Sequence, residues 1–282
     1  MEDIYQRNKE TAWCPGCGNF PIRKALIKAL EELDLTPDQV VMFTGIGQAA
    51  KMPHHMRINA FNGLHGRALP PAIGQRIVNH NLKTIVESGD GDTYGEGGNH
   101  LLHNLRRNPD LAHLVHNNQI YGLTKGQASP TTEAEMETVI QPNGITAKAF
   151  NPIKFAVAME ASFVARSFSG DIDHLSKMIK LAIKHRGYAL LDILQPCVTF
   201  NKINTYQGYN KRVYKLGEDY NPNEQDIALK KAEEWGDEIP IGVIYKTEKE
   251  TFRDKFPQLD DQPLVEKKDS VKQAESYLDD FR

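Results

Sequence analysis

Cysteine is scarce in this sequence. The 282 residues include three cysteines, Cys14, Cys17 and Cys197. Small secreted domains depend on an even and dense set of disulfides, so this odd, small number argues against a disulfide framework. It favours a reducing compartment, and we expect a cytoplasmic protein.

Long apolar runs and an excess of charge of one sign are also lacking. No run approaches the roughly 18 residues that a membrane span needs. Residues 1–5 lack the basic start and apolar core of a signal peptide. The formal net charge is −3, which indicates neither a nucleic acid nor an anionic membrane as partner.

What the sequence does have is an alternation of strand and helix patterns, with glycine-rich turns after several strands. This order predicts an α/β fold with a doubly wound, mostly parallel sheet. The expected strands are 40–43, 83–88, 111–116, 162–167 and 188–194, with a weaker one at 239–245. The expected helices are 21–33, 96–108, 151–158 and 171–185, with one more ending near residue 79.

One stretch, from Gly89 to Thr124, stands out. Asp90 follows one expected strand and Asn118 follows the next, and ligands of parallel sheets bind at such carboxyl ends. A carboxylate and an amide oxygen are hard ligands of the kind that Mg²⁺ takes when it carries a diphosphate, and the carbonyl of Ile120 is a third candidate ligand. The alternative is two unrelated polar turns.

Two further turns are candidate ligand contacts. Gly45 and Gly47 follow the strand 40–43 and allow a ligand to approach the backbone closely. His65 and Arg67 bracket a glycine ahead of an apolar helix, an arrangement that favours an anion. For the two glycines, the alternative is an ordinary strand-to-helix turn. For His65 and Arg67, the alternative is a surface turn in which the histidine already has its hydrogen-bond partners.

Cys14-Pro15-Gly16-Cys17 forms a tight turn whose spacing suits a metal ion or an iron–sulfur cluster. A redox pair and a purely structural turn are the other interpretations. A redox pair usually follows a strand, and none is expected before Trp13, so a metal or cluster is favoured. Cys197 comes just after the strand 188–194, on the same edge as the acidic turn.

Taken together, these motifs resemble the beta subunit of the 2-oxoacid:ferredoxin oxidoreductases over roughly residues 10–245. The resemblance is carried by Trp13–Phe20, Gly45–Gly47, Leu64–Ala68, Gly89–Asp92, Asn118, Tyr121–Thr131 and Pro196–Thr199. It implies a thiamine diphosphate-binding fold. It also implies a subunit of an enzyme that oxidatively decarboxylates a 2-oxoacid and transfers the acyl group to coenzyme A, with pyruvate and 2-oxoglutarate as the favoured substrates. Electrons would pass through a [4Fe-4S] cluster to ferredoxin.

The resemblance also implies site residues. Mg²⁺ would be held by Asp90, Asn118 and Ile120, and the cluster by Cys14, Cys17 and Cys197. Lys125 would pair with a substrate carboxylate, while Lys51 and Lys202 would steer the diphosphate or substrate; each lysine is otherwise a solvated charge. Lys125, His65 and Lys51 are the catalytic candidates. The cofactor would be lined by Ile46, Gly47, Gln48, Ala49, Gly63, Leu64, His65, Gly66, Gly91, Asp92, Gly122, Leu123 and Lys202.

The sequence departs from the family at one cluster position. The family has a cysteine directly after Gly-Ile-Gly, and this chain has Gln48 there. We expect a four-iron cluster whose last iron is bound by water, Gln48, His54 or His55. A three-iron cluster or loss of the cluster are the other possibilities.

The resemblance further implies an incomplete active site. The glutamate that activates thiamine diphosphate would come from an alpha subunit, so we expect this chain to be inactive alone. We predict a thiamine diphosphate and Mg²⁺ domain over residues 1–205, and a C-terminal extension over 206–282 that contacts a partner. The rival interpretations are a non-catalytic metal- or cluster-binding scaffold and a thiamine decarboxylase or carboligase, which would need a longer chain.

Overall fold

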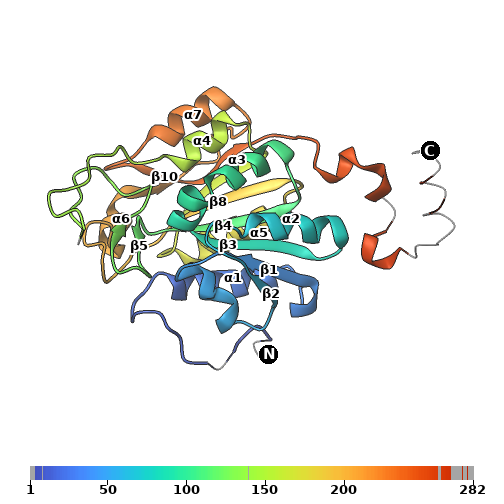
Figure 1. The fold of residues 1–282 in the computed structure, drawn as a ribbon. Coiled ribbons are helices and arrows are strands. Elements are labelled where there is room, and N and C mark those ends of the chain that lie inside the picture. The colour runs from blue at the N-terminus through green and yellow to red at the C-terminus, as the bar shows by residue number, and fades with distance from the viewer. Residues whose placement is uncertain are drawn as a thin grey trace.

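The computed structural model describes residues 4–7, 9–138, 140–259 and 262–267, together with residues 275 and 278. An eight-stranded sheet with the order β2-β1-β3-β4-β8-β7-β10-β9 forms its centre (Figure 1). All pairs are parallel except β7 with β10, which is antiparallel. The strands are β1 (Val40–Thr44), β2 (Asn59–Asn62), β3 (Lys83–Gly89), β4 (Leu111–Asn117), β7 (Phe163–Phe168), β8 (Tyr188–Leu194), β9 (Val213–Lys215) and β10 (Ile239–Lys246). The short strands β5 (Ile120–Tyr121) and β6 (Gln127–Ala128) form a separate hairpin.

Helices cover both faces of the sheet, and a hydrophobic core lies on each side. One core packs α1 (Asn19–Glu31) and α5 (Ile172–Lys184) against the strands. The other packs α2 (Leu69–Val78), α3 (Gly98–Arg107), α4 (Pro152–Ala158) and α7 (Gln225–Glu233). Figure 1 shows α3, α4 and α7 above the sheet and α1 below it. Because both faces are covered, every residue of the central strands β4 and β8 is buried.

The helices form where sequence signals place them. In α1 a proline stands in the first turn, and Ile22, Leu26 and Leu30 recur at helical spacing on the buried face. Asp171 caps α5, and its side chain accepts a hydrogen bond from the backbone amide of His174. The predicted α/β class with a mostly parallel sheet is confirmed.

The C-terminal part of the chain takes up regular structure before it becomes irregular. Residues 206–246 contain α6 (Tyr206–Arg212), β9, α7 and β10, and both strands join the main sheet. From residue 247 to residue 267 the described residues form the short 3-10 helices η4 (Arg253–Lys255), η5 (Pro257–Leu259) and η6 (Leu264–Glu266). The domain boundary at residue 205 and the partner contact stay predictions, and most of the tail beyond Glu266 lies outside the described residues.

Among the described residues, no helix has both the length and the apolar character needed to cross a membrane.

Candidate cofactor site

The carboxyl ends of three neighbouring parallel strands, β1, β3 and β4, meet at a cavity of about 80 Å³. Most of the residues that sequence reasoning assigned to the cofactor and to Mg²⁺ line this cavity. They are Ile46, Gly47, Gln48, Ala49, His65, Asp90, Gly91, Asp92, Asn118, Ile120, Gly122 and Leu123. The expectation that these turns lie together is therefore supported by the position of each strand end.

Asp90 is buried at this edge, directly after β3. Its Oδ2 atom accepts hydrogen bonds from the Ser129 hydroxyl at 2.5 Å and the Thr131 hydroxyl at 2.7 Å. Burial raises the pKa of Asp90 to about 6, although the two hydroxyls act in the opposite direction. Two hydroxyls hold this buried carboxylate beside a cavity, where it can bind a cation. The positive charge of the cation would compensate the cost of burying the negative charge of Asp90.

Asn118 and Ile120 are held in one tight turn after β4. The Asn118 side-chain oxygen accepts a 3.0 Å hydrogen bond from the backbone amide of Ile120. Gln119, between them, has a φ of 59°, in the left-handed region that is uncommon for a residue other than glycine. Such backbone strain is concentrated at functional turns. Asn118 and Ile120 line the same cavity as Asp90.

Asp92 connects the turns that form the floor of the cavity. Its Oδ1 atom accepts hydrogen bonds from the backbone amides of Ile46 at 3.0 Å and Gly66 at 2.7 Å. The same atom lies 2.8 Å from Nδ1 of His65. Burial raises the pKa of Asp92, and the two amides and His65 oppose that shift. A β-carbon on Gly45 would lie 2.0 Å from the Asp92 carboxylate, so only glycine fits there.

Glycines leave the cavity open and let one aromatic ring approach. A β-carbon added at Gly47, Gly89 or Gly122 would meet no atom within 4 Å, so at these points the backbone faces open space. By contrast, a β-carbon on Gly91 would lie 2.2 Å from the ring of Tyr121. The residues therefore fit a bound group with a backbone-lined cradle, as a diphosphate needs.

Several assigned residues do not line the cavity. Gly63, Leu64 and Gly66 are not among its lining residues, and Leu64 is 74% exposed. Lys51 lies in the 3-10 helix η2 (Ala49–His55), Lys125 is exposed with a φ of 69°, and Lys202 donates a hydrogen bond to the Val198 carbonyl. Their catalytic and cofactor roles stay predictions.

Sequence reasoning did not assign four residues that shape the site. Ser129 and Thr131 hold Asp90, and Tyr121 donates hydrogen bonds to the Gly91 carbonyl and to Glu96. Ser129 and Thr131 were seen only as part of a long polar loop, a feature that is more often functional than not. Their spacing to Asp90 along the chain has no recognisable period, so no local pattern could have paired them.

The three cysteines lie around a second, adjoining cavity of about 50 Å³. Gln48, Asn118 and Gly122 belong to the walls of both cavities, so the cysteines lie directly beside the cofactor floor. Burial raises the pKa of Cys17 to about 11, with a smaller contribution from Cys197. No three acidic, histidine or cysteine side chains of the described residues are grouped so as to bind a single metal ion.

Gln48 lines the cysteine cavity, whereas His54 and His55, the other candidate ligands of the fourth iron, do not. The Gln48 side-chain oxygen is buried and has no hydrogen-bond partner among the described residues. His54 and His55 do not line the cysteine cavity. His55 instead packs edge-on against Trp13, with ring centroids 4.7 Å apart. The backbone carbonyl of Gln48 accepts a hydrogen bond of 2.9 Å from the Trp13 indole, which fixes the residue at the cavity wall.

Two protein families match consecutive parts of this chain. Residues 40–193 match the thiamine pyrophosphate enzyme family, in its C-terminal TPP-binding domain. Residues 197–261 match the family that describes the C-terminal part of the pyruvate ferredoxin oxidoreductase beta subunit. The chain is 47% identical over 249 residues to the 2-oxoacid:ferredoxin oxidoreductase subunit beta of Saccharolobus solfataricus, covering 84% of this chain and 82% of that protein.

This chain belongs to the 2-oxoacid:ferredoxin oxidoreductase beta-subunit family. Another member, subunit beta of enzyme 1 from Aeropyrum pernix, is 44% identical over 266 residues, which cover 90% of this chain and 84% of that protein. A solved structure of the 2-oxoglutarate:ferredoxin oxidoreductase from Magnetococcus marinus, with 2-oxoglutarate, coenzyme A and succinyl-CoA bound, is similar with a TM-score of 0.91. That match has 33% identity and covers 99% of this chain and 96% of the other.

Family membership confirms the resemblance seen in the sequence. As a member of this family, the chain contains a thiamine diphosphate-binding domain, and the relatives it matches are named as beta subunits.

Proposed function

We propose that this chain binds Mg²⁺ and thiamine diphosphate at the β1–β3–β4 edge and an iron–sulfur cluster at the three cysteines. Together with an alpha subunit it would oxidatively decarboxylate a 2-oxoacid, transfer the acyl group to coenzyme A and pass electrons to ferredoxin. One observation carries the proposal: Asp90, Asn118 and Ile120 converge at one cavity whose floor is open glycine backbone.

The Mg²⁺ would be held by the Asp90 carboxylate, the Asn118 side-chain oxygen and the Ile120 carbonyl. Oxygen ligands supplied by one or two protein side chains plus substrate phosphates are typical of protein-bound Mg²⁺. Ser129 and Thr131 hold the Asp90 carboxylate in one orientation, as outer-shell partners of a metal ligand do.

Thiamine diphosphate supplies the carbanion stabilisation that decarboxylation of a 2-oxoacid requires. This chain's own contribution is to bind and orient. The Asp92 carboxylate holds the backbone of Ile46 and Gly66 and lies beside Nδ1 of His65, which leaves Nε2 of that ring to exchange a proton or a hydrogen bond with the substrate. We assign Lys125 to the substrate carboxylate and Lys51 and Lys202 to attraction of anions.

The cluster would be held by Cys14, Cys17 and Cys197, with Gln48 as the fourth ligand. The unpartnered Gln48 oxygen at the cysteine cavity favours this residue over His54, His55 and water. A metal deprotonates coordinating thiols, so the raised pKa of Cys17 does not prevent ligation. The shared wall of the two cavities would give electrons a short route from the cofactor to the cluster.

An alpha subunit is needed to enclose the cofactor. The cavity of about 80 Å³ is well below the roughly 300 Å³ at which small-molecule pockets begin. The missing walls, together with the acid that activates the cofactor, would come from the partner.

We propose 2-oxoglutarate as the first substrate to test and pyruvate as the second. The similar structure from Magnetococcus marinus contains 2-oxoglutarate, coenzyme A and succinyl-CoA, and it matches nearly the whole chain. Because most of the substrate pocket would lie on the alpha subunit, pyruvate and larger oxoacids belong in the same assay.

The test is anaerobic purification of the chain with and without its alpha subunit, followed by assays of ferredoxin or viologen reduction with each oxoacid and coenzyme A. We expect turnover by the complex and none by the chain alone. Full turnover by the isolated chain would refute the division of the active site. Iron and sulfide are measured on the same samples. Near-zero iron would contradict the cluster assignment and would leave the assignment of the cofactor site unaffected.

A further inference from the structure

A buried side chain, Gln195, donates a hydrogen bond to one of the three cysteine sulfurs. Gln195 follows β8 directly, lines the cysteine cavity and is 1% exposed. Its Nε2 atom lies 3.7 Å from Sγ of Cys17 and 2.9 Å from Oδ1 of Asn19. The two hydrogens of this amide therefore have separate acceptors, and one of these acceptors is a candidate cluster ligand.

A chain of buried polar groups holds Gln195 in this position. Oδ1 of Asn19 also lies 2.7 Å from Nδ1 of His116, and because an amide oxygen can only accept, that nitrogen carries a proton. Nε2 of His116 lies against the carboxylate of Glu87, and both of these side chains are fully buried. The nitrogen and the carboxylate share one proton, so the pair has no net charge and its donor toward Asn19 is fixed.

A ligating thiolate also determines which way the Gln195 amide faces. The side-chain oxygen of Gln195 and Nδ2 of Asn19 have no hydrogen-bond partner among the described residues. Reversing both amides would place the Gln195 oxygen against the sulfur of Cys17. An oxygen acceptor repels a metal-bound thiolate, whereas an amide N–H is attracted to it. Ligation of a cluster by Cys17 therefore favours the orientation in which Gln195 donates.

The cysteine turn leaves room for this side chain. A β-carbon on Gly18 would lie 2.3 Å from Cγ of Gln195, so a larger residue directly after Cys17 would displace the amide. Gly18 has an ordinary helical φ of −60°, which means that space rather than backbone conformation requires glycine here. The backbone of Gln195 is held as well, because its amide donates a 2.9 Å hydrogen bond to the carbonyl of Asn117.

The surroundings of Cys17 differ from those of Cys14. Cys14 is exposed and accepts a hydrogen bond from the Thr199 hydroxyl at 3.3 Å, where water competes. A donor that is itself buried, as Gln195 is, acts more strongly on a sulfur atom. Burial raises the pKa of Cys17, and the charges of Cys197 and Cys14 add to this shift, so the three sulfurs lie close together, as a shared cluster requires.

We propose that Gln195 is a positioning residue that raises the reduction potential of the iron–sulfur cluster through its hydrogen bond to Cys17. This rests on the proposed function, in which Cys14, Cys17 and Cys197 hold the cluster. An added electron increases the negative charge on the sulfur ligands, so an N–H donor stabilises the reduced cluster more than the oxidised one. The buried groups behind Gln195 keep the donor directed at the sulfur.

The test compares the wild type with Gln195→Met and Gln195→Leu, each purified anaerobically with the alpha subunit. Both substitutions remove the amide, and methionine nearly keeps the length of the side chain beside Gly18. Iron and sulfide are measured first. The reduction potential of the cluster is then measured by redox titration followed by electron paramagnetic resonance.

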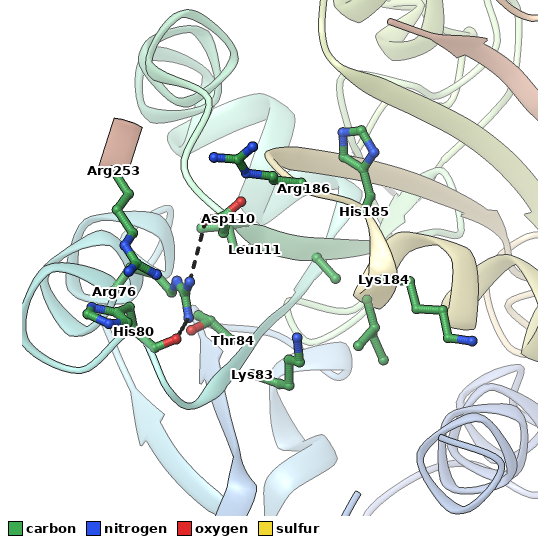
Figure 2. Close-up of a pocket in the computed structure, with 12 residues that line it drawn as sticks. Arg76, His80, Lys83, Thr84, Asp110, Leu111, Lys184, His185, Arg186 and Arg253 are labelled. Atoms are coloured by element: carbon green, nitrogen blue, oxygen red, sulfur yellow. Dashed lines mark hydrogen bonds and ion pairs between the residues drawn. The ribbon is translucent and has the colours of Figure 1, made fainter. Parts of the chain in front are cut away.

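Gln75→Met is the matched control, because it removes a hydrogen-bonded amide elsewhere in the fold. Gln75 donates to the carbonyl of Asn79, and its side-chain oxygen accepts from Thr84. Thr84 lies in a pocket where β3 and β4 begin, at the opposite edge of the sheet from the cysteines (Figure 2).

We expect the same iron content in all four proteins and a lower potential in the two Gln195 variants. At a fixed ambient potential, the ratio of oxidised to reduced cluster should rise about tenfold, which corresponds to about 59 mV for one electron. The Gln75→Met potential should equal that of the wild type.

A wild-type potential in the Gln195 variants would overturn the proposal, and so would an equal fall in Gln75→Met. If only one Gln195 variant keeps its iron, its potential decides. Iron lost from both but kept by the wild type would also overturn the proposal, because the side chain would then retain the cluster rather than set its potential. Near-zero iron in the wild type would refute the cluster assignment itself, and the iron assay distinguishes that failure from the others.

Discussion

The Oδ1 atom of Asp92 accepts a hydrogen bond of 2.7 Å from the backbone amide of Gly66. Since the same oxygen also accepts from the amide of Ile46, this one buried side chain joins two turns that are far apart in the sequence. We predict that Asp92→Asn weakens thiamine diphosphate binding by about tenfold, a loss typical of an outer-shell partner. It should also lower the free energy of unfolding by about 1–3 kcal/mol, because a buried hydrogen-bonded charge is removed.

Calorimetric titration of the cofactor and urea unfolding measure these two effects. The matched control is Asp226→Asn, since Asp226 is exposed on α7. Equal cofactor affinity in Asp92→Asn and the control would show that the floor of the cavity does not depend on Asp92.

Ser129 and Thr131 should matter through Asp90. We predict that Ser129→Ala and Thr131→Val each raise the Mg²⁺ concentration needed for half-maximal cofactor binding by about tenfold, because the Asp90 carboxylate loses a donor that fixes its orientation. Ser176→Ala is the control, since the buried Ser176 hydroxyl has no hydrogen-bond partner among the described residues. A loss in Ser176→Ala as large as in the other two would assign the effect to general packing.

Gly91 is predicted to tolerate no side chain, because a β-carbon there would overlap the ring of Tyr121. Gly91→Ala should weaken cofactor binding and lower the unfolding free energy by about 1–3 kcal/mol, as overpacking does. Adding Tyr121→Ala should recover part of the lost stability by making room. Gly74→Ala provides the contrast: in α2 a β-carbon meets nothing within 4 Å, so we expect a gain of about 0.5–1 kcal/mol.

The cluster ligand assignment predicts a spectroscopic change. In Gln48→Ala the unique iron should be lost more readily, which shifts the electron paramagnetic resonance signal toward a three-iron species. Gln48→Cys should keep four irons and lower the reduction potential, because a thiolate adds negative charge. The same four-iron signal and potential in wild type and both variants would exclude Gln48 as a ligand.

The buried His113 should make the free energy of unfolding depend on pH. Burial lowers the pKa of His113 to about 3, whereas an exposed histidine in an unfolded chain titrates near about 6.5. Between these values the unfolded chain binds a proton that the folded chain does not. The free energy of unfolding should therefore fall as pH drops below about 6.5, by at most about 1.4 kcal/mol per pH unit from this group.

The slope is measured by urea unfolding of the full chain at several pH values. His113→Gln should flatten it, and His54→Gln, at an exposed position, should not. An equal slope in wild type and His113→Gln would contradict the assignment.

Some of the site could be predicted from sequence because ligands of parallel sheets bind at the carboxyl ends of the strands. Asp90 and Asn118 each follow a buried strand, and β3 and β4 are neighbours in the sheet, so the two turns meet. The strands themselves carried clear patterns, and even the weak one at 239–245 corresponds to β10. Family motifs then placed the glycine turns and the cysteines at the same edge.

Tertiary contacts were harder to predict. Ser129 and Thr131 reach Asp90 across about forty residues of chain through a loop without periodicity, and only the folded sheet brings them together. The turn Gly91–Glu96 is a π-helix that precedes α3, whereas the sequence pattern indicated a helix starting near Glu96.

The central claim is that Asp90 and the strand-end turns of this chain hold the Mg²⁺–thiamine diphosphate group. Calorimetric titration of thiamine diphosphate with Mg²⁺ into the complex with its alpha subunit tests it most directly, with wild type, Asp90→Asn and Asp226→Asn compared. We predict saturable binding by the wild type and by Asp226→Asn, and binding weaker by at least about tenfold in Asp90→Asn. Equal affinity in all three, or no saturable binding by the wild type, would contradict it.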